Sequence, residues 1–516
     1  MRIGTSRAAC IMLAQPIYTV AEIRTLEQRA FAEQPEPPLM VRAGQAAARE
    51  AQALLRDGGR HVLVVAGPGN NGGDALEVAT HLKRAFHRVS VVFAGDPAKL
   101  PADAAAALEK WRAVDGQLLL DIPPQARFDL AVDGLFGIGL QRPLEGRIAT
   151  LVAALNGMPC PRLAIDIPSG LDADTGAVKG CCVRATRTVT FIAAKPGLMT
   201  LDGPDHCGEV VVDAIGLDVE RLLEAKGRTL DRAILDRLPT NRPQNFHKGL
   251  AGSLAIIGGA SGMLGAPMLA GRASLKTGAG KVFIGMLDDD APPVDWLQPE
   301  LMLRRPEALV TDAAIDAFAV GPGLGQDANA QRLVAQALRA DRPLVLDADA
   351  LNLLAAYSVL QHAAAGRKAP TILTPHPAEA ARLLASDTTA VLGDRVAHAL
   401  ELARRFNAHV VLKGNGSVVA SPDGRWWINT SGNPGMASGG MGDTLTGIVG
   451  SLLAQRTPAC DALLGAVWLH GAAADALVER GAGPLGIAAS DLVEPARAIL
   501  NRRAVDSDPE AARGAA

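Results

Sequence analysis

Short apolar runs alternate with alanine-rich stretches along almost the whole chain, and this alternation constrains the fold more than any other feature. The apolar runs predict buried strands, and the stretches between them favour helices. Strands that alternate with helices form parallel sheets covered by helices, so the sequence predicts an α/β fold. The expected strands are 61–66, 88–93, 129–133, 162–166, 188–193 and 209–213 in the first half, and 253–257, 281–286, 317–320, 343–347, 370–373, 409–412 and 417–420 in the second. The expected helices include 76–85, 102–113, 265–276, 378–384, 394–406 and 444–455.

The chain has 516 residues, and single hydrophobic cores stop growing at about 250–300 residues. We therefore expect two domains of similar size. A segment that mixes charges with Pro239 and Pro243 follows the last expected strand of the first half, and it indicates a linker. The predicted layout is an N-terminal extension 1–15, a first domain 16–225, a linker 226–246, a second domain 247–503 and a disordered tail 504–516.

The composition excludes several classes of protein. A net charge of −3 and an aromatic content of 3% are unlike a general nucleic-acid coat or a base-stacking protein. No apolar run reaches the roughly 18 residues that a membrane span requires, so we expect neither a nucleic-acid nor a membrane partner. Six cysteines without a CxxC pair predict free thiols and a cytoplasmic enzyme, with neither a disulfide framework nor a zinc site.

Glycines gather directly after the first expected strand. They let the backbone approach a ligand closely and turn its N–H groups toward an anion, at the N-terminal end of the next helix. The spacing is not that of an ordinary NAD fingerprint. A tight loop without a ligand is the alternative. The loop contains Gly67, Gly69, Gly72 and Gly73, with polar side chains from Asn70, Asn71 and Asp74.

Two further polar loops follow expected strands of the first half, at 133–143 and 166–172. The carboxyl ends of parallel strands lie at one edge of a sheet, so Asn71, Asp133, Asp166 and Ser169 should converge. Asp133 and Ser169 offer hard oxygen ligands suited to a non-transition cation. Asp166 is the candidate for proton transfer if burial raises its pKa toward neutrality. The alternative is that the two aspartates only cap the following helices.

The strongest motif of the second half is a glycine-rich loop at 433–443 that leads into an expected helix. Gly439, Gly440 and Gly442 at a helix N-terminus form an anion hole of backbone N–H groups, suited to the charge of a transferring phosphoryl group. Asp443 can accept a proton from a substrate hydroxyl there. A simple N-cap is the alternative for this aspartate.

Other strand-end loops of the second half should lie at the same edge. Lys413, followed by Gly414, Asn415, Gly416 and Ser417, would place a cation and open backbone near nucleotide phosphates, although a solvated lysine is the alternative. His376 and the glycine loop 321–325 also follow expected strands. No GxxxxGK[ST] motif occurs, which excludes a P-loop nucleotidase.

Taken together, these motifs resemble two known families. AGPGNNGGD, DGLFGIGLQRPLEG and DIPSGLDADTG are similar to the NAD(P)H-hydrate epimerase domain of the YjeF N-terminal family. HKG, GGASGMLGA, GPGLG, DADALN, TPHPAE, KGNGS and SGNPGMASGGMGDTLTGIVG resemble the ADP-dependent NAD(P)H-hydrate dehydratases. The resemblance implies a Rossmann-like three-layer α/β/α domain followed by a ribokinase-like α/β/α domain, in the order of the bifunctional NAD(P)H-hydrate repair enzymes.

The resemblance also implies an activity. Water adds to the nicotinamide ring of NADH and NADPH and gives R and S hydrates, which are useless as hydride donors. The first domain would interconvert them, and the second would restore the S form to NAD(P)H while ADP becomes AMP and phosphate. Implied cofactors are K⁺ in the first domain and Mg²⁺ with ADP in the second. The resemblance implies a homo-oligomer, a tetramer or larger.

Site residues are carried over from the matching motifs. Those implied to bind the hydrate in the first domain are Asn70, Asn71, Gly72, Gly73, Asp74, Gly137, Ile138, Gly139, Leu140, Gln141, Arg142, Pro143 and Asp166. Asn71, Asp133 and Ser169 match K⁺ ligands, and Asp166 matches the acid/base residue. Those implied to bind the hydrate in the second domain are Ala266, Gly323, His376 and Asp443, with Asp443 also catalytic. Lys413, Gly414, Asn415, Gly416, Ser417 and Gly442 match the ADP site.

Two rival hypotheses remain open from the sequence. The first is a small-molecule kinase of the ribokinase superfamily with an N-terminal ligand-binding scaffold domain, which predicts a stable phosphorylated product and a preference for ATP. The second is a non-enzymatic role of the first domain as a binding module. Asp133, Asp166 and Ser169 argue against the second, because a scaffold has no need of them.

Overall fold

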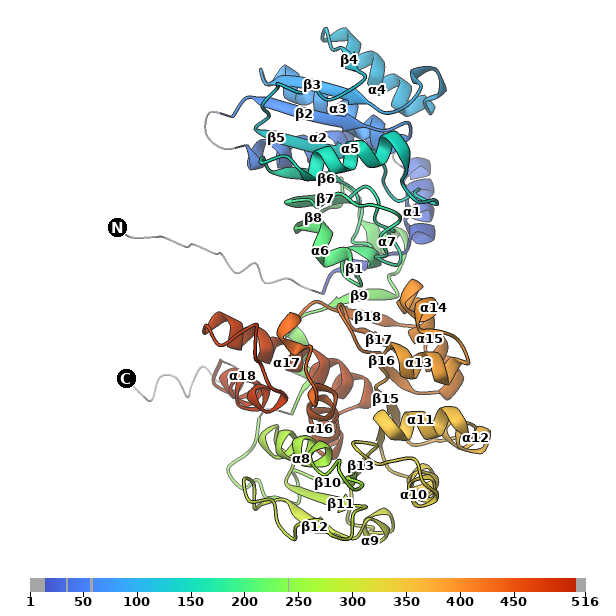
Figure 1. Cartoon of the computed structure of the whole chain (residues 1–516), viewed down its shortest axis with the longest axis vertical. Coiled ribbons are helices and arrows are strands. Elements are labelled where there is room, and N and C mark those ends of the chain that lie inside the picture. Colours follow the sequence, from blue (N-terminus) through green and yellow to red (C-terminus); the bar gives the residue numbers. More distant parts are fainter. Residues whose placement is uncertain (1–13, 34–35, 56–58, 240, 507–516) are drawn as a thin grey trace, which may run out of the picture. The chain divides into compact units, whose positions relative to one another are not determined.

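The computed structural model describes residues 14–33, 36–55, 59–239 and 241–506 (Figure 1). The chain separates into two compact units at the Gly227–Arg228 peptide bond. The first unit comprises residues 15–227, and the second begins at Arg228. Of the predicted extension 1–15, residues 1–13 lie outside the described residues, as does the part 507–516 of the predicted tail.

The first unit has one parallel sheet with the strand order β4-β3-β2-β5-β6-β7-β8. Its strands are β2 (His61–Ala66), β3 (Arg88–Phe93), β4 (Leu118–Leu119), β5 (Leu130–Gly134), β6 (Arg162–Ile165), β7 (Arg187–Phe191) and β8 (Glu209–Asp213). Its helices are α1 (Val20–Glu33), α2 (Leu39–Leu54), α3 (Asn70–Arg84), α4 (Ala102–Ala113), α5 (Gly146–Asn156), α6 (Gly203–Cys207) and α7 (Val219–Leu222). The short strand β1 (Pro16–Ile17) bridges to Ala194.

Successive side chains of β2 point to opposite faces of this sheet, and helices cover both faces. Val62 and Val64 belong to a buried cluster that includes residues of α2, α3 and α4. Leu63 and Val65 point the other way, into a cluster that includes residues of α5. Helices on both faces of a parallel sheet make the unit a three-layer α/β/α domain (Figure 1), which confirms the predicted fold class.

The second unit is also built on a mainly parallel sheet, with the strand order β9-β18-β17-β16-β15-β14-β13-β10-β11-β12. The pairs β16–β17 and β17–β18 are antiparallel. The strands are β9 (Gly227–Leu230), β10 (Ser253–Gly258), β11 (Lys281–Met286), β12 (Met302–Arg304), β13 (Ala317–Val320), β14 (Leu344–Leu346), β15 (Thr371–Leu373), β16 (His409–Leu412), β17 (Val418–Ala420) and β18 (Trp426–Asn429).

Helices cover both faces of the second sheet as well. One face packs on α8 (Gly265–Lys276), α16 (Met441–Ala454), α17 (Ala459–Glu479) and α18 (Val493–Asp506) in a single buried cluster. The remaining helices are α9 (Pro306–Val310), α10 (Ala328–Arg339), α11 (Ala348–Ala356), α12 (Ser358–Ala365), α13 (Pro377–Leu384), α14 (Thr388–Gly393) and α15 (Arg395–Phe406). Of these, α10 packs on β13, and α15 packs on β16 and β17.

The structure differs from the sequence expectation in three places. The expected linker 226–246 contains β9 and a 3₁₀ helix, Arg232–Arg237, which packs against α17. The glycine loops also end earlier than expected, because α3 begins at Asn70 and α16 at Met441. Five short strands were not predicted: β1, β4, β9, β12 and β18.

Helix α17 is 21 residues long and apolar. Among the described residues it alone is long and apolar enough, by length and composition, to cross a membrane. It lies against α16, α18, β15 and β16, and most of its apolar window is buried. These contacts are those of a core helix, which passes the same composition test.

The described cysteines support the expectation of free thiols. Cys160, Cys181, Cys182, Cys207 and Cys460 are all unpaired thiols in the structure, whereas Cys10 lies outside the described residues.

The crossing of α8 and α16 supplies a stability prediction. A Cβ atom on Gly447 would lie 2.1 Å from the backbone oxygen of Ala270. Gly447→Ala should therefore destabilise the second unit by about 1–3 kcal/mol through overpacking, which exceeds the gain of roughly 1 kcal/mol in helix propensity. Pulse proteolysis in urea, followed on fragments of the second unit, measures the shift. Gly393→Ala is the control, because nothing lies within 4 Å of its added Cβ. An equal response of the two variants would contradict the close helix crossing.

Candidate active sites

Three chain segments of the first unit converge at the carboxyl edge of its sheet. Asn71 lies in the first turn of α3, Gly137 in the loop after β5, and Asp166 directly after β6. A Cβ atom on Gly137 would lie 3.0 Å from Asn71 Oδ1 and 3.2 Å from Asp166 Oδ2. The structure thus brings these three expected site residues together. The side-chain Nδ2 of Asn71 is buried and has no hydrogen-bond partner among the described residues.

Asp133 and Ser169 form a second pair at the same edge. Ser169 donates from Oγ to Asp133 Oδ1 at 2.6 Å and from its backbone N–H to Asp133 Oδ2 at 2.8 Å. Burial raises the pKa of Asp133 to about 6, against the lowering effect of these hydrogen bonds. No ion pair among the described residues involves this carboxylate, which is only 1% exposed. The next helix, α5, has Glu145 as its N-cap, so the alternative that Asp133 caps a helix is wrong, and its oxygens could hold a cation.

Asp166 is held by a lysine that the sequence analysis did not single out. Lys195 Nζ lies 2.6 Å from Asp166 Oδ1 and also donates to Thr190 Oγ1 at 2.7 Å and to the Phe191 carbonyl at 2.8 Å. Lys195 is 1% exposed. Oδ1 of Asp166 is thereby engaged, while Oδ2 is the oxygen beside Gly137. Asp166 has a φ of 65°, a left-handed conformation that costs a non-glycine residue energy and is typical of functional sites.

The charge of Asp166 helps to raise the pKa values of two further carboxyl groups. Burial, together with the charges of Asp166 and Glu27, raises the pKa of Asp74 well above its usual value. Burial and the charge of Asp166 also raise the pKa of Glu27 on α1. The edge is thus acidic, with Lys195 as its buried counter-charge.

The other expected residues of the first unit surround this centre. Gly72 and Gly73 are buried, and each also has a packing role, because an added Cβ would lie 1.9 Å from Gly67 O and 2.9 Å from Ala104 Cα, respectively. Leu140 is buried, and its carbonyl accepts a hydrogen bond of 3.2 Å from Lys179 Nζ. Ile138 is half-buried. Asn70, Gly139, Gln141, Arg142 and Pro143 are exposed.

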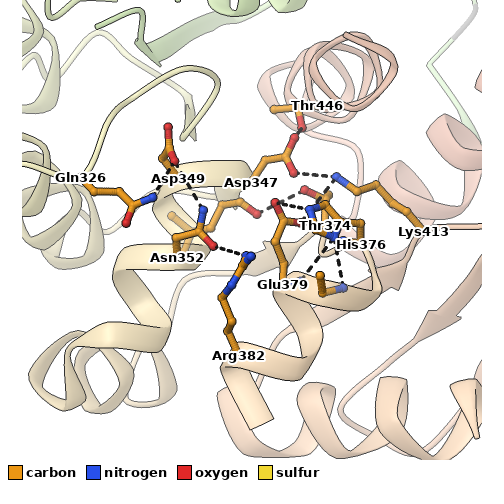
Figure 2. A network of polar contacts seen from close by, with 12 residues as sticks. Gln326, Asp347, Asp349, Asn352, Thr374, His376, Glu379, Arg382, Lys413 and Thr446 are labelled. Carbon is orange, nitrogen blue, oxygen red and sulfur yellow. Dashed lines mark hydrogen bonds and ion pairs between the residues drawn. The ribbon is translucent and has the colours of Figure 1, made fainter. Parts of the chain in front are cut away.

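A buried aspartate at the end of β14, Asp347, is the centre of the second site. Figure 2 shows Lys413 and Thr446 reaching it from two sides. Lys413 Nζ lies 2.9 Å from Oδ1, and Thr446 Oγ1 donates to Oδ2 at 2.8 Å. Burial alone would raise the pKa of Asp347, but the Lys413 ammonium and the hydrogen bonds outweigh it and lower that pKa. Lys413 is therefore paired and partly buried, which excludes the alternative of a solvated lysine.

Asp443 lies next to this ion pair. Burial, reinforced by the charge of Asp347 and opposed by Lys413, raises the pKa of Asp443 to about 7. The N-cap of α16 is Gly440, with φ of 86°, and Asp443 is the third residue of the helix. The alternative of an N-cap role for Asp443 is therefore wrong. A half-buried carboxyl that titrates near neutrality is suited to accept a proton from a hydroxyl group.

Gly439, Gly440 and Gly442 lie at the amino end of α16, where the first N–H groups of a helix have no acceptor within the helix. Gly439 is exposed, and a Cβ there would meet nothing within 4 Å. A Cβ on Gly442 would lie 3.1 Å from Lys413 Nζ and 3.6 Å from Asp347 Oδ2. The glycine at 442 thus leaves room for a ligand to approach the lysine.

His376 has a structural role beside its expected binding role. It is the N-cap of α13, where its Nδ1 accepts from the backbone of Ala378 at 3.2 Å and of Glu379 at 3.4 Å. Burial and the Lys413 charge lower its pKa, so the imidazole is neutral at pH 7. Glu379 Oε2 lies 4.0 Å from Lys413 Nζ, which brings His376 and Glu379 to the edge of the same network (Figure 2).

Arg395 forms hydrogen bonds to backbone carbonyls at the end of β16 and in the loop that follows it. This guanidinium is 2% exposed and donates to the carbonyls of Asn415 and, at 3.1 Å, of Leu412. Burial lowers the pKa of Arg395 to about 10. Gly414 has φ of 143°, and a Cβ there would lie 2.8 Å from the Arg395 guanidinium. Ser417 Oγ donates to the Gly414 carbonyl at 3.0 Å and closes the turn.

Ala266 and Gly323 form the remaining part of the expected site. A Cβ on Gly323 would lie 3.3 Å from the Cβ of Ala266 at the start of α8. A Cβ on Gly440 would meet Leu269 of the same helix at 2.7 Å. Helix α8 thus contacts both the Gly323 loop and the glycine loop before α16.

Among the described residues there is no group of three or more histidine, cysteine, aspartate or glutamate side chains that could hold a metal ion. A cation in either unit would therefore have at most two such side chains as ligands, together with ligand oxygens, water or neutral protein oxygens.

Comparison with known proteins agrees with these motifs. Residues 36–197 match the family model described as YjeF-related protein N-terminus, and residues 254–496 match that of NAD(P)H-hydrate dehydratase. The chain is 38% identical over 483 residues to a bifunctional NAD(P)H-hydrate repair enzyme of Escherichia coli, covering 91% of this chain and 90% of the relative. The chain belongs to the family of bifunctional NAD(P)H-hydrate repair enzymes.

Other members of this family of repair enzymes are similar over comparable lengths. The Vibrio cholerae enzyme is 39% identical, over 94% of this chain and 98% of its own. Among solved structures, an ADP/ATP-dependent NAD(P)H-hydrate dehydratase from Bacillus subtilis, co-crystallized with ATP/Mg²⁺, is 32% identical with a TM-score of 0.47. It covers 52% of this chain and 95% of its own.

Sequence reasoning missed Lys195 and Asp347 in this repair-enzyme chain. Lys195 follows the run FIAA without a glycine loop, and Asp347 was taken as the last residue of a strand. The signal that could have found them is a charged residue at the carboxyl end of a buried strand, where it needs a partner.

The Lys195–Asp166 pair gives a prediction for the first unit. Removing one partner of a buried ion pair costs about 3–5 kcal/mol, because the other charge is left unpaired. Lys195→Met should reduce the free energy of unfolding of this unit by that amount. Lys195→Met combined with Asp166→Asn should recover part of the loss. Native-state hydrogen exchange of peptides from β6 and β7 measures both. A double variant that is no more stable than Lys195→Met alone would contradict the pairing.

Proposed function

We propose that this chain repairs hydrated nicotinamide cofactors, with the first unit epimerising the R and S hydrates of NADH and NADPH and the second dehydrating the S form at the expense of ADP. Membership of the repair-enzyme family supports the proposal. The observation that carries it is Asp443, whose pKa is about 7, beside Lys413 at the amino end of α16. This is a phosphoryl-transfer arrangement within a chain whose other unit has a separate acidic site.

Asp443 would begin the dehydration by taking the proton of the ring hydroxyl. The hydroxyl oxygen then attacks the β-phosphorus of ADP, and AMP leaves. Lys413 and the N–H groups of residues 439–442 stabilise the charge on the transferring group. The ring C–O bond next breaks with phosphate as the leaving group, and a proton lost from the neighbouring ring carbon restores the double bond of NAD(P)H. Phosphate is a far better leaving group than hydroxide, which explains a kinase-like site in a lyase.

Mg²⁺ fits the second site as an ion held mainly by the nucleotide. Asp347 is already bonded to Lys413 and Thr446, and the described residues offer no cage of three acidic or histidine ligands. Mg²⁺ usually binds to one or two carboxylates together with substrate phosphates and water. When bound, it would neutralise charge on the phosphates.

In the first unit Asp166 would transfer the proton. Its Oδ1 is held by Lys195, which leaves Oδ2 on the side of Gly137 and Asn71. The unpartnered Nδ2 of Asn71 would donate a hydrogen bond to the bound hydrate. Burial and the charge of Asp166 raise the pKa of Asp74, a second carboxyl group at the same edge.

K⁺ fits the pair of Asp133 and Ser169. Both offer hard oxygens 2.6 Å apart, and the carboxylate is buried without a cationic side chain within ion-pair distance among the described residues. Asn71 Oδ1 would complete the protein ligands. When bound, K⁺ would supply the missing counter-charge and hold the loops after β5 and β6. A cytoplasmic homo-oligomer, a tetramer or larger, belongs to the same proposal.

The proposal is tested by the recovery of reduced-nicotinamide absorbance from a mixture of R and S NADH hydrates with ADP, Mg²⁺ and K⁺. The unaltered chain should recover all of the material. Asp166→Asn should stop once the S form is consumed, apart from slow spontaneous epimerisation. Full recovery by Asp166→Asn at the normal rate would reduce the first unit to a binding module. No recovery by the unaltered chain with ADP or ATP would refute the repair function.

The pKa of Asp443 predicts the pH dependence of dehydration. The carboxyl must be unprotonated to accept a proton, so kcat/KM for the S hydrate should rise with pH and level off above about 7. Asp443→Asn should lower kcat by about 10²–10⁴-fold and abolish this rise. Exposed Asp341→Asn is the matched control and should keep the normal profile. A profile of Asp443→Asn that still rises through pH 7 would show that another group accepts the proton.

A further inference from the structure

The glycine-rich loop before α16 has a feature that its binding role does not explain. Residues 432–442 include five glycines, and glycine has more accessible backbone conformations than any other residue. Catalysis by backbone N–H groups depends on their being fixed before the charge develops, since reorganisation during the reaction raises the barrier. Some element outside the loop must therefore hold it in place.

Helix α17 contacts the loop at its entrance. Asp475 on α17 accepts from the backbone N–H of Gly432 at 2.8 Å through Oδ2, and from Asn433 Nδ2 at 2.9 Å through Oδ1. Asn433 Oδ1 in turn accepts from the Gly435 N–H at 3.1 Å. The carboxylate thus holds two consecutive residues directly, including Gly432, whose φ is 106°, and a third, Gly435, through Asn433.

The same helix packs against α16, the helix that follows the loop. Gly471 of α17 lies so close to Ser431 that an added Cβ would be 2.3 Å from the serine Oγ. Helix α17 therefore contacts the residues before the loop as well as the helix after it.

We propose that Asp475 is a positioning residue for dehydration, which orients the anion hole through Gly432 and Asn433 without touching the substrate. This inference rests on the proposed dehydratase function. Asp475 also lines a cavity of about 690 Å³, together with Trp468, Ala472 and Glu479. This space allows Asp475 to be replaced without overpacking the helix.

The hydrogen bonds permit a test by exchange of the two side chains. Asp475→Asn places two amides opposite each other, and Asn433→Asp places two carboxylates opposite each other. In the double variant the new amide at 475 accepts from the Gly432 N–H and donates to the new carboxylate at 433, which still accepts from Gly435. Each hydrogen bond is restored, with one direction reversed. Glu479→Gln, one turn further along α17 and lining the same cavity, is the matched control.

The measurement is kcat and KM for the S hydrate and for ADP in the full chain. We expect Asp475→Asn to lower kcat by about 10²-fold, as a displacement of about 1 Å at catalytic groups does, with both KM values within about threefold. The exchanged double variant should recover at least tenfold of that loss. Glu479→Gln should match the unaltered chain. Urea midpoints of the second unit should be equal for the unaltered chain and the double variant.

Two outcomes would overturn the inference. One is a kcat of Asp475→Asn within twofold of the unaltered chain, and the other is a double variant no faster than Asp475→Asn. An unaltered chain that regenerates no reduced nicotinamide in the same assay would refute the proposed function itself, and the inference with it. The two failures are therefore distinguishable.

Discussion

A buried ion pair between Asp347 and Lys413 determines the chemistry of the second unit. The aspartate at the end of β14 is 1% exposed, so its charge needs a partner, and the lysine at the end of β16 supplies it at 2.9 Å. The pair fixes the lysine where a glycine at 442 leaves room for phosphate. The same aspartate helps to raise the pKa of Asp443 to about 7. The proposed anion binding and the proposed proton acceptance thus both depend on this carboxylate.

The first unit uses a similar pair for a different purpose. Lys195 and Asp166 also lie at the carboxyl edge of a parallel sheet, at 2.6 Å. Here the paired aspartate is the proposed reacting group, and the lysine orients it by engaging one oxygen. In both units the lysine is at least partly buried, and the parallel topology brings polar loops together at the carboxyl edge of the sheet. Each site thus has a fixed charge at that edge.

Much of the fold and of the candidate sites could be predicted from the sequence. The strands 61–66, 88–93, 281–286 and 409–412 were predicted with the bounds that the structure has, because buried parallel strands are continuous apolar runs. Asn71, Asp133, Asp166 and Ser169 were expected to converge. Asn71 and Asp166 both lie beside Gly137, and Asp133 and Ser169 are hydrogen-bonded to each other. The start of α3 was placed too late because glycine disfavours helices. At Gly72 and Gly73 close packing outweighs this propensity, since neighbouring backbone atoms leave no room for a side chain.

Lys195, Asp347 and Asp475 were not found, because their roles depend on partners 29, 66 and 43 residues away.

The product balance of a single reaction tests most directly whether the second unit dehydrates the hydrate at the expense of ADP. The S hydrate of NADH, ADP and the full chain are mixed with Mg²⁺, and AMP, phosphate and reduced nicotinamide are quantified together. If the second unit dehydrates the hydrate at the expense of ADP, AMP, phosphate and NADH appear in equal amounts, with no phosphorylated nicotinamide compound left at the end. A stable phosphorylated product, formed without recovery of NADH, would contradict it and identify the second unit as a kinase.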